Sequence, residues 1–313
     1  HGHSAENYRY KILENADPAD YPRLLCGIYK LVTGEKLDLD NPKSFNEKIQ
    51  WMKLYDSTQE KTKLADKYLV RDWVKEKIGE QYLVPLLGVW DSFDDIDFDT
   101  LPNAFALKCN HGSGMNLVVK DKSKIDIKKA KEQFDAWMNT NFAFMAGLEL
   151  HYKDIPRKII AEKYIEQMDS DLIDYKIHVF NGEPKIIQMI GQRDLINHTA
   201  RECFMTPRWV QEDLMYHTYD SYDVPPARPD NLDDMLDIAG KLGSGFRYVR
   251  VDLYDLDGQI MFGEMTFTPA SGFGKWGGYC KHIQSAPGLI YKYFVIEVRK
   301  EEISWESSLN LAA

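Results

Sequence analysis

Polar and apolar residues alternate on both sides of Asp257-Gly258 across residues 245–267, GFRYVRVDLYDLDGQIMFGEMTF. Alternation with a period of two is typical of half-buried strands, and an Asp-Gly pair between them is a frequent hairpin turn. The segment therefore predicts two antiparallel strands. The length of the loop decides which side chains share a face, because successive residues of a strand point to opposite sides of the sheet.

We expect a loop with an odd number of residues, such as 256–258 with Gly258 in the left-handed conformation. A two-residue turn would put Asp252 and Glu264 on opposite faces. With the odd loop, Glu264 lies opposite Arg250 and diagonal to Asp252, with roughly 7–8 Å between the diagonal backbones. Two carboxylates at that spacing can converge on one Mg²⁺, which prefers oxygen ligands. An acidic face in solvent is the alternative, and it is weakened by the neighbours that would share the face: Arg250, Thr266 and Thr268.

Helical patterns fill the N-terminal region and recur between the strands. Residues 5–60 read as helical, and Ser44 and Glu47 have the capping-box spacing ahead of an apolar series at i, i+4, i+7. Further helices are expected at about 62–77, 126–141 and 231–243. Strands are expected at 81–84, 105–108, 116–119 and 158–165, and a hairpin over 175–190 turns at Asn181-Gly182. The pattern predicts an α+β fold in which hairpins outnumber βαβ units.

Composition narrows the class of protein. The 313 residues suffice for about two domains. A formal charge of −10 and a pI near 5.4 argue against general affinity for nucleic acid or anionic membranes. No apolar run approaches the length of about 20 residues that spans a bilayer, and no signal peptide is recognised, so we expect a cytoplasmic protein. The scattered cysteines are expected to be buried thiols rather than a metal site: Cys26, Cys109, Cys203 and Cys280.

A glycine loop at 110–114, NHGSG, joins two expected strands. A P-loop or a dinucleotide fingerprint needs a helix directly after the glycines, so both are excluded. Backbone N–H groups of such a hairpin can approach phosphates closely, although in isolation the motif favours a hairpin without a ligand. Lys108 on the preceding apolar strand is more informative, because an inward-facing lysine needs an anionic partner. An outward-facing Lys108 would remove this argument.

Taken in order over about residues 62–270, these features resemble the ATP-grasp superfamily. Asp66-Lys67 with Arg71 looks like a helical element whose lysine reaches the phosphates, and Lys108 looks like the second nucleotide lysine. The resemblance identifies the flexible phosphate loop as His111, Gly112, Ser113 and Gly114.

Residues 160–165, IAEKYI, look like the adenine linker of that superfamily. By resemblance, Glu162 belongs to the nucleotide site, and the Lys163 carbonyl and the Ile165 N–H bind the base. Asp174 is then the candidate ribose contact.

The hairpin matches the superfamily's magnesium motif, with Arg250-x-Asp252 on one strand and Glu264 on the other. Thr266 stands where Asn is common, and we assign it as the third metal ligand. The resemblance implies ATP and Mg²⁺ as cofactors and gives Arg250 a catalytic role in stabilising negative oxygens. Lys108 and Arg201 are the other catalytic candidates.

Within the superfamily, four segments resemble the teichuronopeptide-biosynthesis (TupA-like) branch: PKSFNEKIQWMKLYD, LADKYLVRDWV, DYKIHVFNGEPKII and GEMTFTPASGFG. This implies an ATP-dependent ligase joining a carboxylate, such as a sugar uronate, to an amino acid or other amine in bacterial surface-polysaccharide biosynthesis. The partners would be these small molecules or glycans, with peripheral association to a membrane polysaccharide assembly system. Lys275 and Trp276 are candidate substrate contacts on the loop that follows, for which a mobile lid is the alternative.

The resemblance implies an ATP-grasp fold with two α+β subdomains gripping ATP and a helical N-terminal region. We expect an N-terminal region at 5–104, a small subdomain with the phosphate loop at 105–165, and a large subdomain with the magnesium hairpin at 166–313. Two other functions stay open. A glycosyltransferase would use a divalent ion and carboxylates but would need no pair of convergent lysines. A nucleotide-binding module without turnover is the third.

Overall fold

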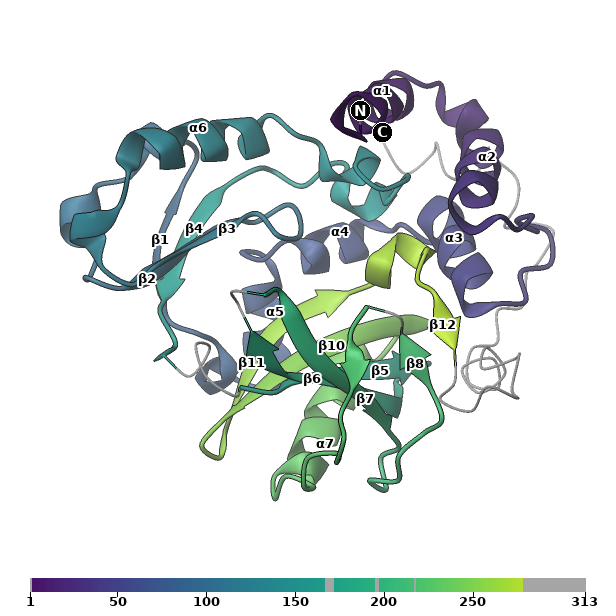
Figure 1. The fold of residues 1–313 in the computed structure, drawn as a ribbon. Coiled ribbons are helices and arrows are strands. Elements are labelled where there is room, and N and C mark those ends of the chain that lie inside the picture. The colour runs from purple at the N-terminus through teal and green to yellow at the C-terminus, as the bar shows by residue number, and fades with distance from the viewer. Residues whose placement is uncertain (1, 167–171, 195–196, 217, 278–313) are drawn as a thin grey trace.

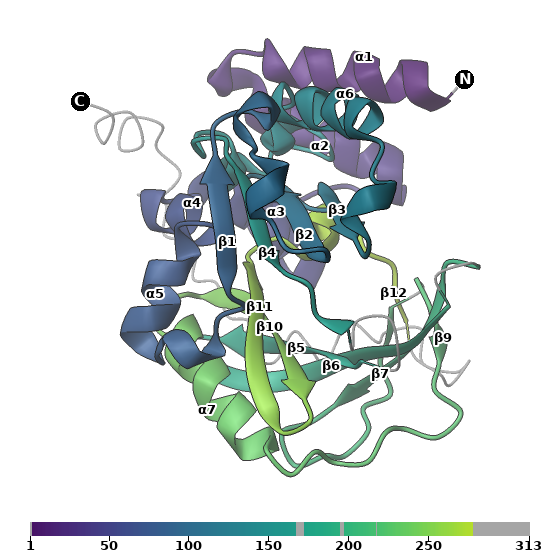
Figure 2. The same ribbon diagram turned by 90° about the vertical axis from the view of Figure 1, so that its left-hand side faces the viewer.

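Two antiparallel sheets face each other across the molecule, with the N-terminal helices at one end of both (Figures 1 and 2). The computed structural model describes residues 2–166, 172–194, 197–216 and 218–277. The expected α+β class is confirmed, and of the strand pairs described only the short one between β7 and β9 is parallel.

The smaller sheet has the strand order β1-β4-β2-β3 and is covered on one side by α6 (Figure 1). Its strands are β1 (Leu86–Trp90), β2 (Phe105–Cys109), β3 (Asn116–Val119) and β4 (Ile159–Lys163), and α6 spans Ile127–Met138. The strand expected at 81–84 is wrong, because residues 80–82 form a short 3-10 turn. β1 comes from the segment that we assigned to the N-terminal region, and the domain limits stay a prediction.

The larger sheet has the order β11-β10-β5-β6-β7-β9. Its two faces differ as the period of two requires. One face packs apolar side chains such as Ile177 and Val251 against α7. The other face packs Phe180 and Ile186 against α3 and carries polar side chains farther along its strands. The bounds are β5 (Asp174–Phe180), β6 (Glu183–Asp194), β7 (Thr199–Met205), β9 (Asp220–Ser221), β10 (Tyr248–Leu256), β11 (Gln259–Thr266) and α7 (Leu232–Gly243), with β8 (Met215–Tyr216) and β12 (Trp276–Gly277) forming a separate pair.

The remaining helices precede the sheets in the chain. They are α1 (Gly2–Glu14), α2 (Tyr21–Thr33), α3 (Phe45–Tyr55), α4 (Gln59–Ala65) and α5 (Val70–Lys77). The capping box of Ser44 and Glu47 is present at the start of α3. The single helix expected at 62–77 is instead broken at Asp66, whose backbone is extended. In the described part of the chain, no helix combines the length and apolarity needed to cross a bilayer.

The expected thiols are present as free cysteines wherever the structure describes them. Cys109 and Cys203 are buried and Cys26 is partly buried, while Cys280 lies outside the described residues. Burial raises the pKa of Cys109 and of Cys203 to about 12, so both thiols stay protonated at neutral pH. They act as small apolar side chains of the two cores.

Candidate active site

A cavity of about 440 Å³ lies between the two sheets, within the range of about 300–1,000 Å³ usual for small-molecule sites. Its walls come from β2, β3 and β4 of the smaller sheet and from β5, β10 and β11 of the larger one. The sequence-predicted residues that line this cavity are Lys67, Lys108, Ser113, Gly114, Glu162, Lys163, Ile165, Asp252 and Glu264. We call it the main cavity.

Lys108 has the anionic partner that its position on an apolar strand predicted. Its Nζ lies 2.6 Å from Oε2 of Glu162 on the neighbouring β4. Arg71 on α5 lies 3.2 Å from the other carboxylate oxygen and donates to the Val84 carbonyl. Glu162 thus holds two cations on the smaller-sheet wall, where an incoming anion would compete for Lys108.

The break between α4 and α5 directs Lys67 at the glycine loop. Asp66 caps the turn by accepting from the N–H groups of Tyr68 and Leu69 at 2.7 and 3.2 Å. The Lys67 ammonium donates to the carbonyl of Gly112. Burial lowers the pKa of Lys67, and Glu264 across the cavity partly offsets this. A lysine in this state gains most from a nearby anion, because burial penalises an unpaired charge.

The loop itself is tightly packed on its inner side. A side chain at Gly112 would come within 2.7 Å of Phe142, and Gly114 has a φ of +73°, which favours glycine. The His111 ring lies against the Trp137 carbonyl at 3.1 Å, and burial lowers the pKa of this histidine. Ser113 and Gly114 line the main cavity, whereas His111 and Gly112 do not.

The loop of the magnesium-motif hairpin differs from our expectation. Leu256 pairs with Gln259, so Asp257 and Gly258 form a two-residue turn rather than an odd-numbered loop. Both residues have positive φ, 54° and 95°, as a type I′ turn requires. The odd loop that we inferred is therefore wrong.

The two carboxylates nevertheless share a face, because a bulge at Gly263 shifts the register by one residue. Asp252 lies directly opposite Glu264, and Arg250 lies opposite Thr266. Glu264 was expected opposite Arg250, which is also corrected. A side chain at Gly263 would come within 3.0 Å of the Asp252 carbonyl, which explains the glycine at the bulge.

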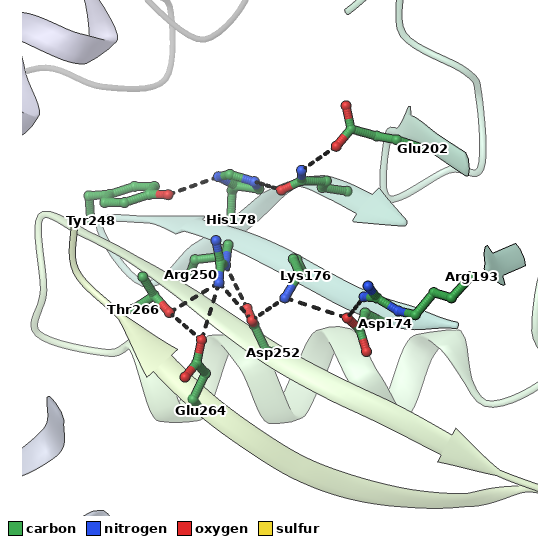
Figure 3. Close-up of polar contacts among 11 residues, drawn as sticks. Asp174, Lys176, His178, Arg193, Glu202, Tyr248, Arg250, Asp252, Glu264 and Thr266 are labelled. Atoms are coloured by element: carbon green, nitrogen blue, oxygen red, sulfur yellow. Dashed lines mark hydrogen bonds and ion pairs between the residues drawn. The ribbon is translucent and has the colours of Figure 1, made fainter. Parts of the chain in front are cut away.

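A row of alternating charges crosses the larger sheet beneath the main cavity (Figure 3). Arg250 donates to both oxygens of Asp252 at 2.7 Å, and Lys176 donates to the same carboxylate at 2.6 Å. Lys176 also lies 3.7 Å from Asp174, which pairs in turn with Arg193. We call this series the charged row.

Burial alone would raise the pKa of Asp252, but the charges of Arg250 and Lys176 outweigh it and lower that pKa. Burial likewise would lower the pKa of Arg250, and the charge of Asp252 raises it instead. Both groups are therefore ionised throughout the physiological range. Neither is a candidate for proton transfer.

Two of the three residues assigned as Mg²⁺ ligands have suitable donor atoms. Asp252 and Glu264 supply carboxylate oxygens of the kind that Mg²⁺ takes, and the Glu264 side chain is 36% exposed beside the cavity. The Thr266 hydroxyl donates to Glu264 at 3.1 Å and accepts from Arg250 at 3.2 Å. Among the described residues, no three His, Cys, Asp or Glu side chains gather as a metal cluster. Mg²⁺ would have to complete its shell with water or phosphate oxygens.

The structure does not bring every candidate to the main cavity. Asp174 pairs with Arg193 beside it, and Arg201 donates to the Ser221 carbonyl at 3.0 Å. Lys275 and Trp276 line a separate cavity of about 290 Å³ against α2 and α3. The Trp276 ring N–H donates to Asn46, and the ring packs on Phe45, Phe204 and Tyr216.

Sequence reasoning missed Lys176, Arg71 and Lys120 as lining residues of the main cavity. Lys176 had a signal: Asp174, Lys176 and His178 alternate with apolar residues, which places three polar side chains on one face of β5. Arg71 belonged to the quoted motif but was not assigned a contact. Nothing local marked Lys120, which follows β3.

A family model described as TupA-like ATP-grasp matches residues 47–277. Among solved structures, D-alanine–D-alanine ligase from Bacillus anthracis matches at 16% identity, with 66% of this chain and 57% of that one covered and a TM-score of 0.36. Phosphoribosylamine–glycine ligase from Thermotoga maritima matches at 10%, with 66% and 48% covered and a TM-score of 0.37.

N5-carboxyaminoimidazole synthase from Aspergillus clavatus matches at 15% identity, with 69% and 46% covered and a TM-score of 0.35. The chain thus spans about half the length of these solved structures. No curated protein sequence matches it.

Proposed function

Because the chain belongs to the TupA-like ATP-grasp family, as its motifs predicted, we propose that it is an ATP-dependent carboxylate–amine ligase. Membership gives the ATP-grasp fold. The observation that carries the activity is the convergence of Lys67, Lys108 and the glycine loop with Asp252 and Glu264 on one cavity. Two lysines and two carboxylates around one space suit a phosphorylated nucleotide with its counter-ion, and phosphoryl transfer depends mainly on positioning and charge.

The smaller-sheet wall would hold ATP. Lys67 and Lys108 would bind the phosphates as point charges, and the backbone of Ser113 and Gly114 would cover them. Lys163 and Ile165 line the cavity at the end of β4, where the adenine would lie. The Lys163 N–H already donates to the Pro85 carbonyl at 2.9 Å, so the carbonyl rather than the N–H of Lys163 would contact the base.

The larger-sheet wall would hold the reacting groups. Mg²⁺ bound at Asp252 and Glu264 would neutralise the phosphate being transferred. Arg250 is fixed by Asp252, Glu264 and Thr266, so its guanidinium is already oriented for negative oxygens. The substrate carboxylate would attack the terminal phosphate to give an acyl phosphate, and an amine would then displace phosphate to form the amide.

We extend the proposal to the substrates. The family resemblance supports a uronic acid as the carboxylate and an amino acid or small amine as the nucleophile, within bacterial capsule or surface-polysaccharide biosynthesis. Trp276 supports a sugar contact, since it borders both the cavity with Lys275 and a small one beside Arg250. Use of ATP supports a cytoplasmic location, with peripheral association to a membrane assembly system.

Incubation with ATP, Mg²⁺, a pool of uronates and hydroxylamine tests the activity. We expect ADP and phosphate to appear only with a carboxylate present, and a hydroxamate to form. With ¹⁸O in the carboxylate, label must appear in the released phosphate. Thermal stabilisation by UTP or UDP-sugars and none by ATP would refute the proposal, because a ligand that binds the folded state raises its apparent stability.

Glu264→Gln tests the role of the hairpin. It removes a carboxylate with little change in volume, and we expect turnover to fall by about 10²-fold or more while the fold is kept. Glu212→Gln is the matched control, because Glu212 is partly exposed, as Glu264 is, and lies outside the main cavity. A Glu264→Gln enzyme with the wild-type rate at limiting Mg²⁺ would contradict the assignment.

A further inference from the structure

A second, smaller cavity of about 150 Å³ lies on the same face of the larger sheet as the main cavity. The residues that matter are Lys176, Arg250, Gln188, Glu202, Tyr216 and Trp276, all of which line it. Lys176 also lines the main cavity, so the two spaces meet at the charged row. We call this space the side cavity. A group bound in it would lie next to a reaction centred on Arg250 and Asp252.

A second row of hydrogen bonds crosses the sheet here, parallel to the charged row (Figure 3). It contains Tyr248, His178, Gln188 and Glu202, from β10, β5, β6 and β7. Gln188 Nε2 lies 2.8 Å from the Glu202 carboxylate, and its amide oxygen lies 3.4 Å from His178 Nε2. His178 Nδ1 lies 2.9 Å from the Tyr248 hydroxyl.

The direction of this row is fixed by its ends. The ionised Glu202 carboxylate only accepts, so Gln188 donates to it with its amide nitrogen and accepts from His178 with its oxygen. The imidazole is then a neutral tautomer with its proton on Nε2, and Tyr248 donates to Nδ1. Burial lowers the pKa of His178 to about 3, which agrees with a neutral ring. We call this series the neutral row.

Glu202 is a buried carboxylate without a matching cation. It is 2% exposed, and its hydrogen-bond donors are Gln188 and the N–H of Tyr216 at 3.2 Å. Among the described residues, no lysine, arginine or histidine nitrogen lies within 4.0 Å of its oxygens. A buried charge is costly unless it is paired, so a positive ligand would stabilise the ionised form of Glu202.

We propose that the side cavity binds the ammonium group of the amine substrate against Glu202, and that Glu202 takes its proton. This inference rests on the proposed ligase function. The carboxylate accepts a proton from R–NH₃⁺, and the freed nitrogen lone pair forms the C–N bond to the acyl phosphate carbon. The C–O bond to phosphate then breaks with its electron pair on oxygen. The phosphate leaves with the second nitrogen proton as HPO₄²⁻, and Glu202 releases the first proton to solvent.

The side cavity fits such a ligand in size and lining. Its volume is about five times the roughly 30 Å³ that one water occupies in the liquid, enough for a small primary amine or the amino end of a larger molecule. Tyr216 and Trp276 supply aromatic walls, which attract cations.

The charges around Glu202 favour a proton acceptor near neutral pH. Burial raises the pKa of Glu202 to about 7, and Lys176 lowers it only in part. A general base works best with a pKa near the working pH. The other titratable groups around it are His178 on β5, Tyr216 on β8, Tyr219, Arg250 on β10, and Arg201 and Cys203 next to it on its own strand.

The first test compares two nucleophiles in the Glu202→Gln enzyme. Hydroxylamine is uncharged at neutral pH and needs no base, so hydroxamate formation with uronates should stay within about twofold of wild type. Amide formation with a pool of amino acids and ethylammonium should fall by about 10²-fold. Asp220→Asn is the matched control, because it removes one carboxylate that is 88% exposed at the edge of the same sheet.

The outcomes separate this inference from the ligase proposal. Absence of hydroxamate in the wild-type enzyme would refute the ligase. Hydroxamate in the wild type with equal loss of both reactions in Glu202→Gln, or loss of neither, would overturn the role of Glu202 as the base.

The second test needs no turnover. Binding of ethylammonium, with the ammonium ion and tetramethylammonium for comparison, is measured by ligand-observed NMR on the full chain. We expect ethylammonium to bind the wild-type and Asp220→Asn proteins and not the Glu202→Gln protein. No binding to the wild type, or equal binding to all three, would overturn the subsite.

Discussion

Asp252 in the charged row and Glu202 in the neutral row are both 2% exposed on one face of one sheet, yet their pKa values move in opposite directions. Arg250 and Lys176 outweigh the cost of burial at Asp252 and lower its pKa. At Glu202 the donors are a neutral amide and a backbone N–H, so burial prevails and raises the pKa to about 7. Burial raises the pKa of either carboxylate, and the charges of its partners decide the direction of the net shift.

The difference in pKa suits the two carboxylates to different chemical roles on neighbouring strands. A carboxylate that stays ionised can hold a cation and orient Arg250, whereas one that titrates near pH 7 can exchange a proton. Lys176 lies between them, because it donates to Asp252 and its charge also reaches Glu202. The rows are chemically distinct but electrostatically linked.

The largest effect on stability is expected from Asp252→Asn. This change leaves Arg250 and Lys176 buried without their anion, and breaking a buried pair costs about 3–5 kcal/mol. The folded-state pKa of Asp252 lies below its ordinary value of 3.8, so the wild-type advantage is present above that pH and is lost as pH falls through the folded value. Urea unfolding of both proteins at neutral pH and near pH 3 measures this. A cost that does not shrink on acidification would contradict the ion-pair explanation.

Glu202→Gln should act in the opposite direction. Between its ordinary value of 4.5 and about 7, the folded protein holds a proton on Glu202 that the unfolded chain has lost, so wild-type stability falls as pH rises through this window. The difference corresponds to about 3 kcal/mol, since each pKa unit is worth about 1.4 kcal/mol. The variant should therefore be more stable than wild type by up to that amount above pH 7, and equal to it below pH 4.5. A variant that is less stable at every pH would show that the carboxylate is held by attractive contacts instead.

Lys176→Met tests the link between the rows. Removal of this charge should raise the pKa of both Asp252 and Glu202, and we expect a stability loss of about 1–2 kcal/mol because Asp252 keeps both contacts to Arg250. NMR titration of ¹³C-labelled carboxylates reports both values. Lys241→Met on the exposed side of α7 is the control. A shift at one carboxylate alone would mean that the rows are independent.

Arg201→Ala should have the smallest effect. Its guanidinium donates to the Ser221 carbonyl, and its side chain is 37% exposed outside the lining of the main cavity. Surface substitutions of this kind change stability by about 0.5 kcal/mol or less. We expect kcat/KM to stay within about twofold, which corresponds to a small change in barrier. A loss of tenfold or more would restore the catalytic role that the sequence suggested for Arg201.

Several local features of the fold were predictable because short-range geometry decides them. The capping box at Ser44, the turn at Asn181-Gly182 and the helix after Asn231 each depend on residues within one turn of the chain. The number of residues in the hairpin loop was predicted wrongly. A glycine inside an alternating strand, such as Gly263, is a sequence signal for a bulge. With a bulge there, a two-residue turn is compatible with Asp252 and Glu264 on one face of the sheet.

The sequence predicted a residue of the site only where a motif identified both the residue and the direction of its side chain. Lys67, Lys108, Asp252 and Glu264 were found on that basis, and all four line the main cavity. Glu202 was not, because nothing beside it in the chain marks it. Its neighbours Gln188 and Tyr216 come from other strands, and the register of β6 with β7 alone brings Gln188 close.

By itself the sequence determined the α+β class, most strands and helices, the family, and four charged residues of the main cavity, Lys67, Lys108, Asp252 and Glu264. These follow from periodicity, caps, turns and ordered motifs, which are local properties of the chain. The tertiary structure decided which carboxylates are paired with cations and which are not. That outcome depends on strand order and register, because the pKa of a buried group is set by charges a few ångströms away in space, however far apart in the chain.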